Sequence, residues 1–366
     1  MGNEMLEARE KISKIDKEMA ALFVKRMECA EIIAGYKSRQ GLQIYDAKRE
    51  EELLQRNLNY VENVDLRPFY KQFMQGTMDV SKRYQHMIVE GTRIAYSGIV
   101  GSFASIAVSK IFPDGLAVPC KNFKEAYEKV ANGECNLAVL PIENSYAGEV
   151  DQVMDLMYDG DLYINGVYGL RVSQNLLGIH DSNLAGIKKV ISHPQALNQC
   201  EDYINIHEFE TEQVVNTAVA AKMVADLKDP TVAAIASKET ADIYGLKLLD
   251  HDINEDAMNT TKFAVFSQTM ETALNASDNS TFIMMFTVKD EAGGLARALN
   301  VMSRYGFNMT TLRSRPVKKV QWQYYFYAEV QGNLATNAGK AMIEDLKEHC
   351  EAVKVLGSFK ETVELA

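Results

Sequence analysis

The sequence NTTKF occupies residues 259–263 and is followed directly by the apolar run AVF at residues 264–266. A polar, acidic loop that ends near Asp256 precedes it. The apolar run predicts a buried strand, so the two threonines and the lysine fall where a loop meets the end of that strand. Ligands bind at strand ends in α/β folds. We therefore expect NTTKF to contact a ligand.

The composition is that of a globular protein with more than one domain. A chain of 366 residues can form two or three domains, and 47% hydrophobic with 24% charged residues gives no sign of disorder. The net charge of −11 disfavours nucleic acid as a partner, because nucleic-acid-binding proteins gather lysine and arginine on one face. Residues 1–90 hold 15 basic and 15 acidic side chains, so the negative charge lies beyond them.

Neither a disulfide framework nor a metal site is expected. The cysteines are widely separated, odd in number and without a CxxC pair, so we expect them to be reduced and mostly packed. The first residues lack the apolar core of a signal peptide, and no run approaches the ~18 apolar residues that a membrane span needs. We expect a cytoplasmic protein without a membrane partner. The cysteines are Cys29, Cys120, Cys135, Cys200 and Cys350.

The first ninety residues predict three helices. Residues 4–39 contain no proline and one glycine, and apolar side chains recur there every three or four residues. One helix of this length would span about 50 Å, more than a domain of ninety residues, so its apolar stripe calls for a second subunit. A homodimer with exchanged helices is therefore expected, or a tetramer if dimers pair. The second helix would begin near Asp46, and the third would cover residues 68–85.

A set of charged and polar side chains recurs along these helices. Any one of them also fits a solvated helix face, because surface ion pairs are common and weak. As a set, their spacing resembles the active-site positions of the all-helical chorismate mutase family. That family converts chorismate to prephenate by a pericyclic rearrangement that needs no nucleophile, metal or cofactor. The set comprises Arg9, Arg26, Lys37, Asp46, Arg49, Glu50, Ser81 and Gln85.

The resemblance implies that arginines bind the two substrate carboxylates, since a guanidinium fork matches a carboxylate. Arg26 and Arg49 would act together with Arg9 from a second subunit. Ser81 would assist them.

The same resemblance implies contacts to the rest of the substrate. Lys37 and Gln85 would stabilise the negative charge that develops on the breaking ether oxygen, each contributing roughly 3 kcal/mol. Glu50 and Asp46 would hold the ring hydroxyl.

From residue 93 to about residue 268, short apolar runs alternate with helical patterns, which predicts an α/β fold. Gly98 and Gly101 do not complete a GxGxxG dinucleotide motif, although a helix that starts there could bind a carboxylate. The predicted strands are residues 93–98, 137–144, 188–192, 232–237 and 261–267. The first predicted helix begins at residue 101. The others cover residues 123–132, 194–203, 217–227 and 238–244.

Three motifs in this region resemble those of prephenate dehydratase. They are PIENS at residues 141–145, SHPQALNQC at residues 192–200 and NTTKF. Taken alone, His193 also fits a hydrogen-bonded histidine at a strand end. The family has two α/β lobes around a cleft, similar to periplasmic binding proteins. The resemblance implies that the cleft is lined by Glu143, Asn144, Ser192, Gln199 and Thr261.

In that family, Thr261 would aid departure of the ring hydroxyl. Loss of carbon dioxide supplies the electrons that expel the hydroxyl and aromatise the ring, so a hydrogen-bond donor suffices and no cofactor is implied. Lys262 stands where the family usually has arginine, and it would bind a substrate carboxylate with the same charge but without the planar fork. Gln174 stands where a histidine is expected, and Arg171 is a second candidate for that carboxylate.

Residues 280–366 predict the order βαββαβ after a polar linker at residues 276–279. The pattern resembles an ACT domain, an amino-acid sensor that pairs across subunits, and implies feedback inhibition by L-phenylalanine. A structural dimerisation module is the alternative. Arg313 stands where phenylalanine-responsive relatives usually have glutamate. The effector-binding residues implied are Gly293, Gly294, Leu295 and Ala296, with Arg313, Ser314, Arg315 and Pro316.

The three resemblances follow one another as a mutase at residues 1–90, a dehydratase at residues 91–270 and a sensor at residues 280–366. This order is similar to the family in which chorismate mutase and prephenate dehydratase are fused, with chorismate and prephenate as substrates. Two alternatives stay open. One is a dehydratase whose helical region only dimerises, and the other is a solute-binding module without catalysis.

Overall fold

The computed structural model describes residues 2–256, 258–271, 280–318, 323–360 and 362–365. The chain divides into two compact units, Met1–Arg93 and Ile94–Ala366. Within the described ranges, none of the helices combines the length and apolar character that crossing a bilayer requires. The predicted linker at residues 276–279 lies outside the described residues.

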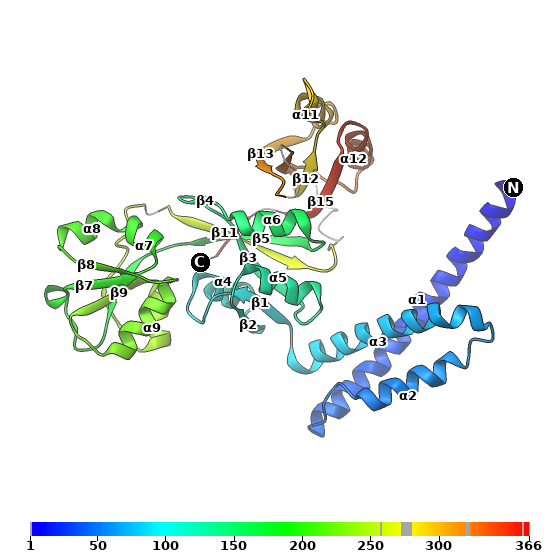
Figure 1. Ribbon diagram of the computed structural model, residues 1–366, viewed down its shortest axis with the longest axis horizontal. Helices are drawn as coiled ribbons and strands as arrows, with labels where there is room; N and C mark the ends of the chain where they lie inside the picture. Colours follow the sequence, from blue (N-terminus) through cyan, green and yellow to red (C-terminus); the bar gives the residue numbers. More distant parts are fainter. Residues whose placement is uncertain (1, 257, 272–279, 319–322, 361, 366) are drawn as a thin grey trace. The chain divides into compact units, whose positions relative to one another are not determined.

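The first unit consists of the three predicted helices, α1 (Gly2–Arg39), α2 (Ala47–Leu58) and α3 (Arg67–Glu90), with a 3-10 turn η1 (Val64–Leu66) before the last (Figure 1). Asp46 caps α2 as expected, because its carboxylate accepts the backbone N–H of Arg49 at 3.0 Å. The third helix runs beyond its predicted end to Glu90. Gly91, at φ 81°, then ends it.

The long helix α1 leaves its apolar stripe uncovered within the single chain. Ile12 is 56% exposed, Leu22 64% and Phe23 44%. Covering such side chains contributes roughly 25 cal/mol for each Å² of apolar surface removed from water. The stripe is therefore a surface whose burial would stabilise an assembly.

The first lobe of the second unit, residues 94–171 and 260–271, is built on a sheet with the strand order β5-β11-β3-β1-β2. The predicted strand at residues 261–267 is β11, which lies antiparallel between β3 and β5 at the centre of the lobe. One face of the sheet packs on α4, and the other on α5 and α6. The elements are β1 (Arg93–Ser97), α4 (Phe103–Ile111), β2 (Leu116–Cys120), α5 (Phe123–Ala131), β3 (Leu137–Asn144), β4 (Gly148–Glu149), α6 (Asp151–Asp159), β5 (Tyr163–Arg171) and β11 (Thr260–Ser267).

The second lobe, residues 172–259, has its own five-stranded sheet with the order β10-β6-β9-β7-β8. Figure 1 shows α7, α8 and α9 around this sheet. The single helix predicted for residues 194–203 is wrong, because the chain turns at Cys200, whose N–H bonds to the carbonyl of Leu197 three residues back. The elements are β6 (Asn175–Gly178), η2 (Leu184–Gly186), β7 (Lys189–Ser192), α7 (Pro194–Gln199), α8 (Glu201–Ile206), β8 (Glu210–Gln213), α9 (Thr217–Leu227), β9 (Val232–Ala236), α10 (Lys238–Tyr244) and β10 (Lys247–Asp250).

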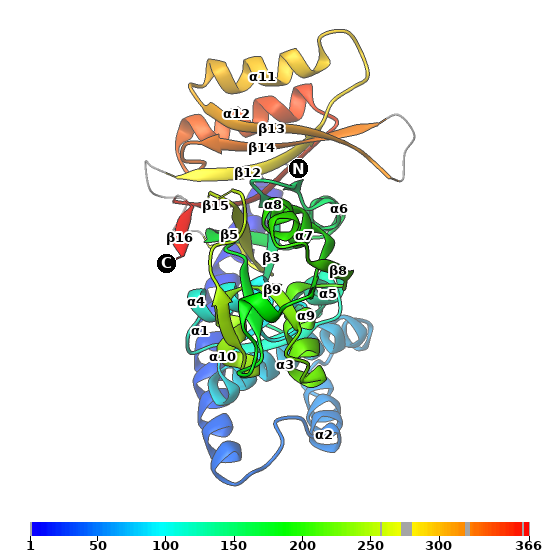
Figure 2. The ribbon, with the colours of Figure 1, turned by 90° about the vertical axis from the view of Figure 1, so that its left-hand side faces the viewer.

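The C-terminal module, residues 280–360, has the expected order βαββαβ. Figure 2 shows α11 and α12 on one side of its strands. The sequence predicts the third strand of this module over residues 321–330, and its first two residues lie outside the described residues. A further strand, β16 (Val363–Leu365), was not predicted and pairs with β5. The elements are β12 (Thr281–Thr287), α11 (Gly294–Arg304), β13 (Asn308–Pro316), β14 (Tyr324–Gln331), α12 (Asn337–His349) and β15 (Ala352–Phe359).

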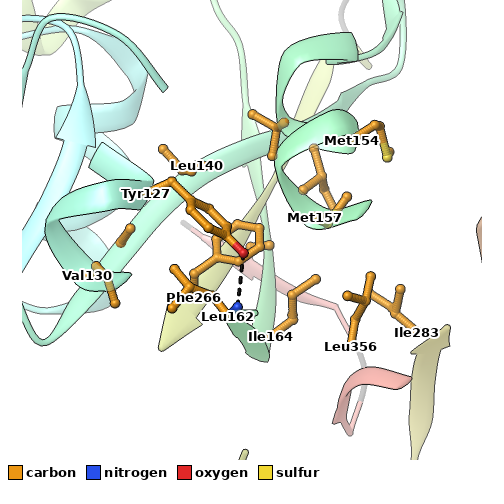
Figure 3. Close-up of a cluster of buried hydrophobic side chains, with 14 of the residues drawn as sticks. Tyr127, Val130, Leu140, Met154, Met157, Leu162, Ile164, Phe266, Ile283 and Leu356 are labelled. Atoms are coloured by element: carbon orange, nitrogen blue, oxygen red, sulfur yellow. Dashed lines mark hydrogen bonds between the residues drawn. The ribbon is translucent and has the colours of Figure 1, made fainter. Parts of the chain in front are cut away.

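The other face of the module packs on the first lobe in one continuous core. Figure 3 shows Ile283 and Leu356 of the module in the same buried cluster as Met157 and Ile164. Tyr158 stacks on Tyr325 with ring centroids 4.4 Å apart. The module and the first lobe therefore share a hydrophobic core, so a shift in the packing of one displaces side chains of the other.

At one point the module's sheet continues into the sheet of the lobe. Gly357 of β15 lies beside Ile164 of β5 as a parallel pair, at φ 153°, where only glycine is comfortable. A Cβ atom at this position would lie 1.9 Å from the carbonyl oxygen of Ile164. The join between the two sheets therefore requires a glycine.

Substitution Gly357→Ala should lower the free energy of unfolding of the second unit by about 3 kcal/mol, because the methyl group meets rigid backbone at a strained φ. Gly245→Ala is the matched control, since Gly245 also has a positive φ of 65° but nothing within 4 Å of its Cβ position. That control should cost only about 1 kcal/mol. Urea unfolding of both variants tests the difference, and equal losses would contradict the role of the contact with Ile164.

Candidate active sites

A pocket of about 230 Å³ lies among the three helices of the first unit. Seven of the eight polar residues predicted to form one site line this pocket. The eighth, Arg9, belongs to α1 and is exposed. The lining residues are Arg26, Cys29, Ala30, Ile33, Lys37, Ile44, Asp46, Arg49, Glu50, Leu53, Met78, Ser81, Lys82 and Gln85.

The polar groups of this pocket are held by local contacts. The guanidinium of Arg26 donates to the hydroxyl of Ser81, and its burial lowers the pKa of Arg26. Lys37 Nζ donates to the carbonyl of Ile44 at 2.5 Å. Gln85 is 9% exposed, and among the described residues its Oε1 has no hydrogen-bond partner. A buried carboxamide of this kind is available to a polar ligand.

Lys82 lines the same pocket, although it was not predicted. Its Nζ lies 3.1 Å from a carboxylate oxygen of Glu50 and 2.9 Å from Asp79. Burial acts to lower the pKa of Lys82, but the hydrogen bonds to Asp79 and Glu50 outweigh it and raise the pKa. Only the position of α2 against α3 brings Lys82 to Glu50, so helix periodicity alone could not identify it.

In the second unit, the strand pair β3–β11 brings together two of the predicted cleft residues. Asn144 lies directly opposite Thr261, and its Nδ2 donates to Thr261 Oγ1 at 2.9 Å. The same amide donates to Asn259 Oδ1 at 2.8 Å, while its oxygen accepts the backbone N–H groups of Tyr146 and Ala147. Because Thr261 accepts the bond from Asn144, its own O–H remains a donor for a ligand.

The next pair along these strands points to the opposite face. Lys262 lies opposite Glu143, and their charged atoms are 3.0 Å apart. Arg313 of the C-terminal module also contacts Glu143. Burial acts to raise the pKa of Glu143, but the hydrogen bonds from Arg313 and Lys262 outweigh it and hold the pKa below its usual range. The structure thus sets Lys262 and Glu143 against the module rather than beside Thr261.

The predicted cleft residues of the second lobe make other contacts. Ser192 is fully buried, and its Oγ donates to the carbonyl of Ile235 at 2.6 Å. Gln199 Oε1 accepts from Gln174 Nε2 at 3.2 Å, so the glutamine that replaces the expected histidine meets another predicted residue. His193 caps α7, and burial lowers the pKa of His193.

Arg171, the second candidate for carboxylate binding, lines a pocket of about 520 Å³ where the two lobes meet. Its guanidinium is 3.8 Å from Asp252, whose carboxylate also accepts the hydroxyl of Ser173 at 2.7 Å. Both side chains of this ion pair are more than half exposed, so the pair is weak. The lobes are joined nearby, where the hydroxyl of Tyr244 donates to the carbonyl of Val100 at 2.7 Å.

The C-terminal module has a hollow of about 600 Å³. Leu295 from the GGLA motif and Ser314 from the RSRP motif both line it. Arg313 and Arg315 alternate with Ser314 along β13 and contact carboxylates of the first lobe instead. The lining residues are Val288, Lys289, Asp290, Glu291, Leu295, Ser314, Gln323, Tyr324, Phe326 and Glu351, so Gly293, Gly294, Ala296 and Pro316 are not among them.

Comparison with known proteins matches both units. Residues 94–271 match the family model described as prephenate dehydratase, and residues 8–86 match the model described as chorismate mutase type II. A bifunctional chorismate mutase/prephenate dehydratase from Enterobacter agglomerans is 31% identical over 375 residues, which cover 98% of this chain and 96% of that protein.

Two solved structures each resemble 73% of the chain. The prephenate dehydratase of Staphylococcus aureus is 27% identical with a TM-score of 0.64, and covers 73% of this chain and 100% of its own. GqqA, described as a novel type of quorum quenching acylase, is 28% identical with a TM-score of 0.68, and covers 73% of this chain and 97% of its own.

Substitution Asn144→Ala should lower the free energy of unfolding by about 3 kcal/mol, because it leaves the buried Asn259, the half-buried Thr261 and two turn amides without their partner. Asn308→Ala is the control, since Asn308 is exposed and bonds only to the Gln331 side chain in the contacts described. That change should stay within about 0.5 kcal/mol. Urea unfolding measures both, and a mild Asn144→Ala variant would contradict the structural role of the carboxamide.

Proposed function

This chain belongs to the family of bifunctional chorismate mutase/prephenate dehydratases, and we propose that its parts divide two consecutive reactions between them. Residues 1–90 convert chorismate to prephenate, and residues 91–270 convert prephenate to phenylpyruvate. The observation that carries the proposal is the pairing of Asn144 with Thr261 at the end of β3 and β11. The convergence of seven predicted residues on one pocket of the first unit supports the mutase half.

The first reaction requires a pocket with fixed charges rather than a reactive group. Arg26 and Arg49 supply guanidinium groups for the substrate carboxylates, which they bind as bidentate forks. Lys37 and Gln85 donate to the ether oxygen as its bond to the ring breaks, each worth roughly 3 kcal/mol of barrier. Glu50, whose carboxylate lies 3.1 Å from Lys82 Nζ, accepts the ring hydroxyl, with Asp46 next to it.

The mutase pocket is completed by a second copy of the chain. Arg9 does not line the pocket of its own chain. It lies on α1 near the apolar stripe that a single chain leaves exposed. Pairing of two such helices would bury the stripe and carry Arg9 to the other copy's pocket. The homodimer is therefore part of the proposed site.

The second reaction is a decarboxylative elimination at the cleft of the second unit. The bond from the ring to the departing carboxylate breaks, its electron pair enters the ring, and the C–O bond to the hydroxyl breaks with aromatisation. Thr261 donates a hydrogen bond to that leaving oxygen, with its hydroxyl oriented by Asn144. Such assistance contributes ~10²- to 10⁴-fold to the rate. We propose that Gln199 and Ser192 line the cleft from the other lobe.

The geometry at Thr261 favours this elimination over acyl transfer, the activity that the name of GqqA indicates for that protein. A threonine nucleophile needs a base that takes its proton. The partner of Thr261 is the amide nitrogen of Asn144, which is a donor and cannot act as that base.

The C-terminal module acts as an ACT domain that binds L-phenylalanine. Its hollow combines the apolar side chains of Leu295 and Phe326 with charged groups of both signs, including Lys289 and Glu291. An aromatic amino acid presents an apolar ring, a carboxylate and an ammonium group, which this lining matches. Leu295 and Ser314 come from the two motifs that suggested the sensor.

Substitution Thr261→Ala should lower phenylpyruvate formation from prephenate by at least about a hundredfold, because the donor at the leaving oxygen is lost. Thr261→Ser keeps the hydroxyl and should retain most activity.

Lys37→Ala should show the reverse pattern, with chorismate consumption reduced about a hundredfold and the dehydratase step intact. Chorismate, prephenate and phenylpyruvate are followed together without added cofactor. If Thr261→Ala kept full dehydratase activity, the role of Thr261 would be wrong, and a wild-type chain that forms neither product would favour solute binding.

Isothermal titration calorimetry should detect L-phenylalanine binding to the whole chain. Leu295→Ala should weaken it by at least about tenfold, because it removes an apolar wall of the hollow. Leu312→Ala is the control, since Leu312 lies on β13 outside the hollow and is 38% exposed. Absence of binding to the wild type would remove the sensor proposal and leave a dimerisation module.

A further inference from the structure

Glu143 is a carboxylate on which the dehydratase strands and the C-terminal module meet. It is the last residue of β3 but one, its side chain is 20% exposed, and both of its oxygens have cationic partners. Oε2 lies 3.0 Å from Lys262 Nζ on β11, and Oε1 is contacted by Arg313 on β13. Each oxygen of Glu143 therefore pairs with a cation, and one of the two cations, Arg313, comes from the C-terminal module.

Arg313 also contacts a second carboxylate. Its Nε lies 3.2 Å from Glu149 Oε1, and Glu149 of β4 is paired directly with Glu143 of β3. Like charges that face each other across a strand pair repel. The guanidinium bridges the two carboxylates, and its planar fork can donate to both at once. It thereby allows the short β3–β4 pairing to close with two glutamates side by side.

The β3–β4 turn holds the residue that orients the proposed leaving-group donor. Asn144 follows Glu143, and its side-chain oxygen accepts the backbone N–H groups of Tyr146 and Ala147 within this turn. Its amide then donates to Thr261 Oγ1. Movement of the turn would therefore move the carboxamide that sets the direction of the Thr261 hydroxyl.

We propose that Arg313 of the C-terminal module is a positioning residue for the dehydratase reaction. It closes the β3–β4 turn through Glu143 and Glu149, and so holds Asn144 against Thr261. The module supplies a part of the dehydratase site and is more than an attached sensor. This inference rests on the proposed dehydratase function.

The docking of the module does not depend on Arg313 alone, which makes the residue testable. Arg315 contacts Asp151 at the start of α6, and Lys354 Nζ donates to the carbonyl of Met157 at 2.8 Å near the end of the same helix. The shared hydrophobic core adds to these contacts. Removal of the Arg313 side chain should therefore leave the module in place.

Arg313→Ala in the full-length chain should lower kcat for phenylpyruvate formation about tenfold, the effect expected when a carboxylate loses a charged hydrogen-bond donor. KM for prephenate should change less, because the residue acts on the orientation of Thr261. Arg313→Lys keeps the charge but cannot bridge both glutamates as a planar fork, so its kcat should lie between the two. Chorismate consumption should be unchanged in both variants.

Lys318→Ala is the matched control. Lys318 is a cation of the same module whose Nζ pairs with Asp155 of the first lobe at 2.6 Å, and it makes no contact with Glu143 in the contacts described. It should retain wild-type kcat. Equal losses in Lys318→Ala and Arg313→Ala would overturn the proposal, because they would point to the docking charge in general.

The pH profile gives a readout that a merely structural residue would not move. The charged and titratable groups around Glu143 are Lys262 on β11, Arg313 on β13, Glu149 on β4 and Tyr327 on β14, and Glu149 is itself 3.7 Å from Arg315. Without Arg313, Lys262 remains to offset the burial of Glu143 and the negative charge of Glu149. The pKa of Glu143 therefore rises, and the acid limb of kcat moves to higher pH. Lys318→Ala should leave that limb where it is.

An Arg313→Ala variant with wild-type kcat, KM and acid limb would overturn the positioning role. If that variant does not fold, Arg313→Lys decides, and wild-type values in it would likewise count against the bridge. A wild-type chain that forms no phenylpyruvate from prephenate would overturn the dehydratase function itself, which distinguishes the two failures.

Discussion

The antiparallel pairing of β3 with β11 is the constraint on which the second unit depends. Side chains alternate along a strand, so this one register sends the pair Asn144–Thr261 to one face and the pair Glu143–Lys262 to the other. A slip by one residue would exchange the two faces. The hydroxyl would then meet the C-terminal module, and the ion pair would meet the α4 side of the sheet.

The features that could be predicted from the sequence are those that depend on residues close together along the chain. The apolar runs of β3 and β11, the Asp46 cap and the three helices of the first unit were predicted because each depends on neighbours along the chain. β5 was missed because two glycines interrupt its apolar pattern, and β4 has only two residues, Gly148–Glu149. Which side of β11 each residue of NTTKF faces could not be predicted, since that depends on its partner strand. The contact of Lys82 with Glu50 likewise needs two helices in place.

Two of the three positions at which the chain departs from the dehydratase and sensor motifs meet at one carboxylate. Lys262 and Arg313 lie in different parts of the sequence, yet both contact Glu143. A glutamate at position 313 would face Glu143 and Glu149, which would place three carboxylates against Lys262 and Arg315, whose guanidinium lies 3.7 Å from Glu149 Oε2. Arginine there reverses that balance. Each departure looks like a weakened motif by itself, whereas together they form a compensated charge cluster.

Both proposed active sites rely on hydrogen-bond donors and charges in fixed positions. Each needs one residue that comes from outside its own lobe or helix bundle. The mutase pocket collects seven of its predicted residues within one chain, and its remaining arginine, Arg9, would come from a second copy. The dehydratase site is instead completed within the chain, by Arg313 acting on the β3–β4 turn. A reaction without a base has little tolerance for a misdirected donor, because orientation is most of what the protein contributes. In these proposals, assembly acts on the first site through the expected dimer and on the second through the docked module.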